Sequence, residues 1–151
     1  MHAYQLTIPV ENKPGVLASV TAILAREKIN IRATTISSFG NRGFLNFIVD
    51  DPEAAEKALK KAGIAVELRE VIAVLIKDSP GGLDRLVQYL AANSINIENA
   101  YGFVIESRKH AVFVLEVQNP KQVKELLTKE KFETISSKAL SEIEPFHYMR
   151  Y

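Results

Sequence analysis

Apolar and polar residues alternate at the start of the chain, over Tyr4–Val10. A period of two is typical of a β-strand with one buried face, so this segment predicts a half-buried strand with Gln5 and Thr7 on its polar side. Pro14 then opens a helix, because proline suits the first helical turn, where its missing N–H is not needed. Apolar residues recur every three or four positions over Leu17–Leu24, as expected for the buried stripe of that helix.

Patterns of the same two kinds continue to Glu70. Strands are predicted over Ile29–Ser38 and Phe44–Asp50, joined by a turn at Gly40–Gly43. A helix follows from Asp51 to Lys61, and a further strand covers Ile64–Glu70. The order is βαββαβ, which is the ferredoxin-like unit.

The second half of the chain repeats the first. Glu11–Leu17 returns as Lys77–Leu83, and Lys28–Ile31 returns as Ser94–Ile97, both 66 residues later. Because an internal repeat decides the architecture, we predict an α+β fold of two tandem ferredoxin-like βαββαβ units with antiparallel sheets.

Residues 1–70 are the predicted first domain, and residues 71–151 are the second, with a C-terminal tail. No glycine, proline or serine interrupts Val66–Ile76, so the two units should be rigidly apposed. The copy is less clear beyond Phe132, and the last strand is expected between Phe132 and Ile143.

One face of the fifth predicted strand carries Val71, Ala73 and Leu75, where the first copy is more polar. A strand that is apolar on both faces is usually covered on both. The cover could be the other unit, the aromatic tail Phe146–Tyr148, or another subunit.

Composition narrows the functional classes. The 151 residues are 47% hydrophobic and 25% charged, with a net charge of +1 and no cysteine. This globular composition gives no general drive toward nucleic acid or membranes, and it excludes disulfides, thiolate metal sites and a thiol nucleophile. With no signal peptide and no apolar run of about 20 residues, we expect a cytoplasmic protein.

Catalytic chemistry is not indicated. His2, His110 and His147 show no ligand spacing, and Gly81-Gly82 is too short for a nucleotide loop. We therefore expect no enzyme activity, no metal and no cofactor.

The turn before the first helix of each unit is the candidate binding site. A helix N-terminus presents unpaired N–H groups, and glycine lets a ligand approach them. A carboxylate there would be held by Gly15 and Val16, and Asn12 could receive an ammonium group; together these describe an α-amino acid. The corresponding residues of the second unit are Gly81, Gly82 and Asp78. The structural alternative is that Asp78 or Ser79 only caps the helix.

A helix terminus contributes at most about 2 kcal/mol to anion binding, whereas micromolar affinity needs about 8 kcal/mol. Other groups must therefore complete the pocket. Asn30 and Asn96, repeated at the start of the following strands, are the candidates.

The repeated Lys13-Pro14-Gly15 and Ser79-Pro80-Gly81 loops, with Ile29-Asn30-Ile31 and Ile95-Asn96-Ile97, resemble ACT domains. These are regulatory modules that bind amino acids, commonly between two modules. The resemblance covers almost the whole chain and implies a stand-alone tandem ACT protein. It implies that the ligand is contacted by Asn12, Gly15, Val16, Leu17, Asn30, Asp78, Gly81, Gly82, Leu83 and Asn96.

Two alternatives stay open. Arg42-Gly43-Phe44 with Phe47 is a partial match to an RNA-recognition motif, although the neighbouring positions and the charge do not fit. The first unit is also similar to the regulatory subunit of acetolactate synthase, whose C-terminal half does not normally repeat a Pro-Gly motif.

The favoured interpretation is a regulatory protein that senses a small amino acid between modules and modulates a metabolic enzyme or a regulator. We expect no nucleic acid and no membrane partner. An exposed edge strand in each unit predicts a homodimer with pockets completed across the interface. The second site should be the tighter one, because Asp78 carries a full charge where Asn12 is neutral.

Overall fold

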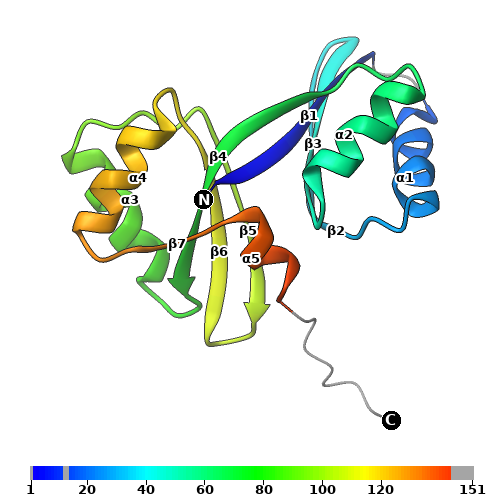
Figure 1. Cartoon of the computed structure of the whole chain (residues 1–151). Coiled ribbons are helices and arrows are strands. Elements are labelled where there is room, and N and C mark those ends of the chain that lie inside the picture. Colours follow the sequence, from blue (N-terminus) through cyan, green and yellow to red (C-terminus); the bar gives the residue numbers. More distant parts are fainter. Residues whose placement is uncertain (1, 12–13, 144–151) are drawn as a thin grey trace. The chain divides into compact units, whose positions relative to one another are not determined.

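The computed structural model describes residues 2–11 and 14–143, and these fall into two compact units. Tyr4–Glu70 form one unit, and the chain from Val71 onward forms the other together with the residues before Tyr4. Figure 1 shows both as sheets covered by helices on one face.

The first unit has the predicted βαββαβ order, which is confirmed. Its sheet runs in the order β2-β3-β1-β4, with β3 antiparallel to both neighbours that flank it. Its elements are β1 (Ala3–Glu11), α1 (Val16–Arg26), β2 (Ile31–Phe39), β3 (Arg42–Val49), α2 (Pro52–Lys61) and β4 (Glu67–Lys77).

The second unit repeats this arrangement in the order β5-β6-β4-β7, with antiparallel neighbours. Its last strand lies within the expected range, whereas the short helix after it was not predicted. Besides β4, the elements are α3 (Gly82–Ala92), β5 (Asn99–Glu106), β6 (His110–Glu116), α4 (Pro120–Lys129), β7 (Glu133–Ile135) and α5 (Ser137–Ser141).

The prediction of two separate strands before and after Glu70 was wrong. A single strand, β4, runs from Glu67 to Lys77 and belongs to both units, and it begins three residues later than expected. The absence of any glycine or proline over this stretch explains the continuity, because nothing ends the extended backbone. The described residues consequently form seven strands rather than eight.

Each unit buries the predicted apolar stripes between its helices and its sheet. In the first unit Leu6 and Ile8 of β1 pack with Val20 and Leu24 of α1. The second core repeats these contacts, and its fully or almost fully buried members include Ile72, Val74, Leu86, Leu90, Leu115 and Leu127. The repeat therefore preserves one packing scheme at two places in the chain.

The polar side of β1 is buried, which corrects the prediction of a half-buried strand. Gln5 is 0% exposed and Thr7 is 4% exposed. Both donate to Asn46 Oδ1 on β3, from Gln5 Nε2 at 3.1 Å and from Thr7 Oγ1 at 3.0 Å. Asn46 Nδ2 in turn donates to Thr35 Oγ1 at 3.1 Å. Hydrogen bonding makes this burial tolerable, because the polar atoms keep partners.

The second face of the second sheet is covered, as its apolar residues predict. Val71 and Ala73 are buried, as are Val112 and Val114 of β6. Part of the cover is α5, whose Leu140 is buried. The aromatic segment 146–148, one of the covers considered above, lies outside the described residues.

Candidate functional site

The two loops suggested by the repeat have the same backbone conformation. Gly15 and Gly81 are the N-cap residues of α1 and α3, with φ of 92° and 89°. Only glycine adopts this left-handed geometry without strain. No side chain of the described residues caps α3, so the alternative role of Asp78 or Ser79 as a helix cap is wrong.

The start of α3 offers two N–H groups that no described residue accepts, those of Leu83 and Asp84. The N–H of Gly82, in contrast, donates to the carbonyl of Ser79 at 3.0 Å. A Cβ at position 82 would also clash with the carbonyl oxygen of Lys77. Gly82 is thus required by the loop's own packing, and Leu83 is the better placed donor.

Asp78 is tied to the hairpin between β5 and β6. Its Oδ2 accepts from the backbone N–H of Arg108 at 2.6 Å, and its own N–H donates to the carbonyl of Lys109 at 3.1 Å. The other carboxylate oxygen can still face a ligand. Sequence analysis missed this contribution of Arg108 and Lys109, because no local pattern shows which hairpin a loop will meet.

The equivalent loop of the first unit is described only in part, since Asn12 lies outside the described residues. Gly15 is exposed, and its carbonyl accepts from both the N–H and the Oγ of Ser19, at 2.9 and 3.0 Å. Val16 and Leu17 are half-buried against the first core. Their backbone can therefore contribute to a site while their side chains anchor the helix.

Asn30 and Asn96 are exposed, and each follows the C-terminal end of the helix whose N-terminus carries the loop. Each of these helices has 11 residues. Such a helix is about 16 Å long, so the asparagine of a unit lies far from that unit's own loop. Within one unit, the structure therefore does not bring all the predicted site residues together.

Asn96 lines a shallow polar cavity of about 290 Å³, which also includes Asn93 and Asn119. The carbonyl of Asn30 accepts from the N–H of Asp50 at 3.1 Å, which orders the start of β2.

Within residues 2–11 and 14–143, the features expected of a metal site or an RNA-binding site do not converge. Among the described residues, no three histidine, aspartate or glutamate side chains lie close enough to hold a metal ion. Burial, and then the charge of Glu116, raise the pKa of Tyr101, but this tyrosine is on β5, remote in sequence from both loops. Phe47 is fully buried in the first core, so it cannot stack on a base. No helix of the described residues is long and apolar enough to cross a membrane.

Comparison with known proteins identifies relatives over almost the whole chain. A family model described as an ACT domain pair matches residues 1–144. The crystal structure of protein BT0572 from Bacteroides thetaiotaomicron is 34% identical, with a TM-score of 0.86, and the match covers 94% of this chain and 97% of that one.

More distant structures share the fold. The ligand-free regulatory subunit of aspartate kinase from Thermus thermophilus is 21% identical, with a TM-score of 0.59, over 85% of this chain and 91% of that chain. The corresponding subunit from Thermus flavus is 19% identical, with a TM-score of 0.58, over 85% and 92%. No curated protein matches the chain.

Proposed function

The chain belongs to the family of ACT domain pairs, and from this premise we propose that it is a cytoplasmic regulatory protein that binds a small amino acid between ACT modules. Binding changes the association of the modules, and a metabolic enzyme or a regulator reads that change. The protein itself catalyses no reaction in this proposal.

The duplicated glycine loop is the observation that carries the proposal. Gly15 and Gly81 take the same left-handed conformation at the start of α1 and α3. At α3, the N–H groups of Leu83 and Asp84 are without a described acceptor and can receive a carboxylate. The free oxygen of Asp78 is suited to an ammonium group.

A second module is needed to complete the site. Asn30 and Asn96 lie about one helix length from the loops of their own units. They can therefore act only on the loop of another unit, either in the same chain or in a second copy.

The edge strands support association through a second copy. β2 is an edge strand of the first unit, and β5 is an edge strand of the second. Ile36 on β2 is 59% exposed and Val104 on β5 is 55% exposed. They occupy matching places in the repeat, opposite Leu45 and Ala111. Exposed apolar residues on an uncovered edge favour pairing, so we propose a homodimer.

Ligand binding can shift such an association only by its difference in affinity between the two arrangements. A pocket made by two modules has this property, because the separated modules offer only half of the contacts. The acetolactate synthase alternative is less favoured, since Gly81 matches Gly15 and the second unit retains a complete loop.

A thermal-shift screen of the proteinogenic amino acids tests the proposal. At a hundred times its Kd, a ligand stabilises the folded protein by about 2.7 kcal/mol. For a chain of this size that corresponds to a Tm increase of roughly 5 to 10 °C. Failure of every amino acid to raise Tm would refute amino-acid sensing.

Variants identify the site and the need for a second module. We expect Asn96→Ala or Asn30→Ala to weaken the shift, and Asn41→Ala, at an exposed turn, to leave it unchanged. Light scattering at micromolar concentration should show a dimer. A strict monomer with and without ligand would rule out pockets shared between chains.

A further inference from the structure

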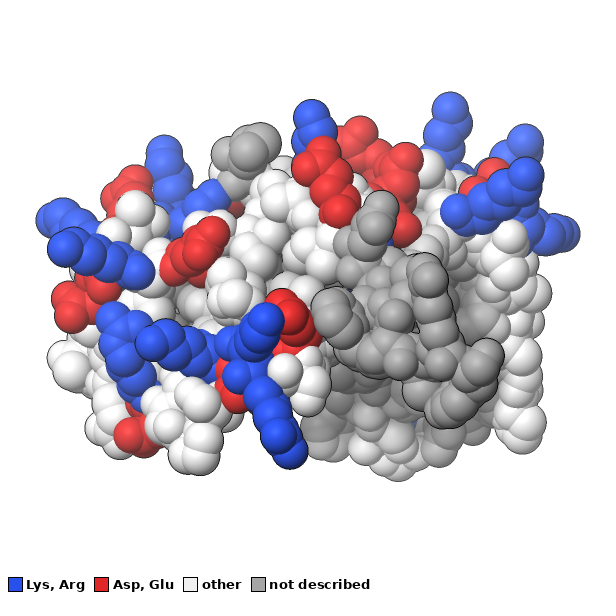
Figure 2. All heavy atoms as spheres, turned by 90° about the horizontal axis from the view of Figure 1, so that it is seen from below, with Lys and Arg blue, Asp and Glu red and all other residues white. Residues whose placement is uncertain are grey.

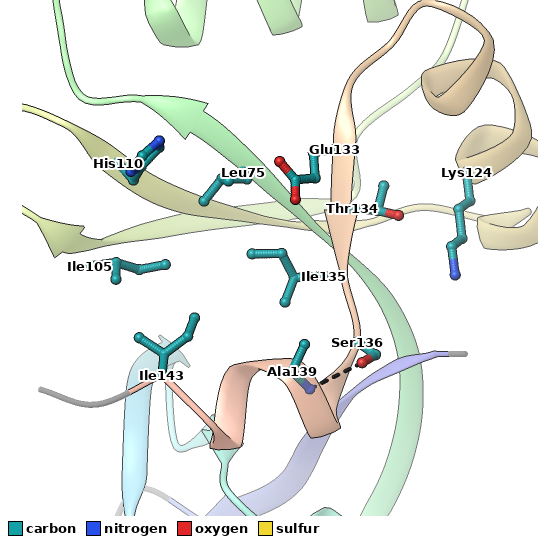
Figure 3. A pocket seen from close by; sticks show the side chains of 10 residues that line it. All are labelled: Leu75, Ile105, His110, Lys124, Glu133, Thr134, Ile135, Ser136, Ala139 and Ile143. Atoms are coloured by element: carbon teal, nitrogen blue, oxygen red, sulfur yellow. Dashed lines mark hydrogen bonds between the residues drawn. The ribbon is translucent and has the colours of Figure 1, made fainter.

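A mostly apolar cavity of about 510 Å³ lies beneath α5 in the second unit. Figure 3 shows Ile105, Ile135 and Ile143 around one space, with Ala139 of α5 at its edge and Leu75 of β4 above it. The Oγ of Ser136 accepts from the N–H of Ala139 at 3.1 Å and so fixes the start of α5. This volume is within the range of small-molecule sites, which are typically apolar with a few polar groups.

A second cavity of about 370 Å³ adjoins the first, because Leu75, His110 and Glu133 line both. Its character is different. The basic side chains of Lys77, Arg85 and Lys131 line it. The apolar space therefore borders a cationic space within one unit.

Arg85 is held in place by an aromatic ring. Its Cζ lies 4.2 Å from the centroid of Phe132, which is a cation–π contact. No described residue forms an ion pair with Lys77 or Lys131. Figure 2 shows basic side chains, with acidic ones among them, on the side of the view where Figure 1 places α3 and α4.

The internal repeat supplies a comparison for these basic residues. The first unit has no basic residue at any equivalent position. Gly63 and Lys131 are equivalent, because each follows the second helix of its unit and has a positive φ. The residues that correspond to Lys77, Arg85, His110 and Lys131 are Glu11, Ser19, Phe44 and Gly63. The cationic space is thus specific to the second unit and is not a requirement of the fold.

We infer that the two adjoining cavities bind a small carboxylate with an apolar body. The carboxylate lies among Lys77, Arg85 and Lys131, and the apolar part lies beneath α5. Glu133, on the shared wall, has no described ion-pair partner and can accept from an ammonium group, if the ligand carries one. The inference does not depend on the proposed site between modules, although Gly82 touches both regions.

Three matched probes test the charge requirement by isothermal titration calorimetry on the full chain. Hydrocinnamate has the apolar body and the carboxylate, phenylalanine adds an ammonium group, and hydrocinnamyl alcohol lacks the carboxylate. We expect hydrocinnamate to bind at least about tenfold more tightly than the alcohol, which is the usual worth of hydrogen bonds to a charged group. Equal binding of the two, or no binding of hydrocinnamate, overturns the inference.

A pair of lysines provides a matched control. Lys131 and Lys28 both have positive φ, 65° and 58°, and both are exposed, but only Lys131 lines the cavities. Lys131→Gly should weaken hydrocinnamate binding by about threefold or more, since it removes one charge from a solvated site. Lys28→Gly should leave it unchanged. If Lys131→Gly binds like wild type, the carboxylate is not where we place it.

The apolar part of the site is tested by Ala139→Leu, which fills the space beneath α5 and should weaken the binding of both hydrocinnamate and phenylalanine. If this variant does not fold, Lys131→Gly alone decides whether the inference holds.

Glu133→Gln tests whether the ligand's ammonium group is bound here. If it is, this variant weakens the binding of phenylalanine but not that of hydrocinnamate. Asp78→Asn should alter the amino-acid response of the loop and leave hydrocinnamate binding unchanged, so the failure of one proposal is distinguishable from the failure of the other.

Discussion

The stability of the first unit should depend on its buried polar network, which is centred on Asn46. Asn46 is 4% exposed, and its side chain makes three hydrogen bonds, to Gln5, Thr7 and Thr35. Asn46→Leu keeps a similar volume and removes all three. The half-exposed Thr35 can turn to water, but the hydroxyl of Thr7, which is 4% exposed, loses its described acceptor.

The cost can be estimated group by group. An orphaned buried donor costs about 1 to 3 kcal/mol, and a typical lost hydrogen bond costs about 1 kcal/mol. Gln5 loses only part of its bonding, because its Nε2 also donates to Thr7 Oγ1 at 2.9 Å. We therefore expect Asn46→Leu to lower the free energy of unfolding by about 2 to 4 kcal/mol. Asn41→Leu, in the exposed turn, should change it by less than about 0.5 kcal/mol.

Urea denaturation followed by circular dichroism measures these differences. A triple variant, Gln5→Leu, Thr7→Val and Asn46→Leu, replaces the three buried side chains of the network by apolar groups and leaves only Thr35, which is half-exposed and can turn to water. Because the penalty comes from the unpaired groups, the triple variant should be more stable than Asn46→Leu alone. A neutral Asn46→Leu, or a triple variant less stable than the single one, would refute this reasoning.

Other predictions concern the loop, the second site and the effect of pH. Gly82→Ala should lower the free energy of unfolding by about 1 to 3 kcal/mol, because its Cβ would clash with the carbonyl of Lys77. Gly81→Ala has open space for its Cβ and should lower it by about 1 to 2 kcal/mol, through the strain of a φ of 89° alone. Urea denaturation of both variants separates the effect of the clash from that of the strain. In calorimetry with the amino acid found by the screen, Asp78→Ala should reduce binding more than Asn12→Ala, and the reverse order would contradict the assignment of the tighter site. Because the pKa of Tyr101 is raised, its hydroxyl loses its proton at a higher pH in the folded state than in the unfolded state. The free energy of unfolding should therefore fall as the pH rises above about 10, and Tyr101→Phe should lessen this fall.

Local chemistry was sufficient to predict most of the elements. Period-two alternation located the strands, and the spacing of apolar residues located the helices of both units. Pro14 was predicted to open the first helix, but α1 begins at Val16, after the N-cap Gly15. Asp51, at the predicted start of α2, caps that helix by accepting from the N–H of Ala54 at 3.1 Å. The repeat also predicted that Gly15 and Gly81 occupy equivalent places, and both are left-handed N-cap residues. These features depend on residues close in the chain, so a sequence pattern contains them.

The errors came from contacts between distant residues. Nothing near Gln5 shows that Asn46, on a neighbouring strand, will satisfy its amide and allow it to be buried. The loop that carries Asp78 also depends on a distant residue, because the backbone N–H of Arg108, 30 residues away, donates to the Asp78 side chain. The separation of Asn30 from Gly15 also needed the structure, because it follows from the direction of α1.

The sequence by itself determined the kind, order and duplication of the elements, because periodicity and backbone preference act over a few residues. Tertiary structure alone decided that β4 serves both units, that α5 covers a cavity, and that basic side chains from β4, α3 and the turn before β7 line one space. The physical reason is that pairing, burial and the gathering of charges depend on which surfaces meet when the chain closes on itself, and that information is not local.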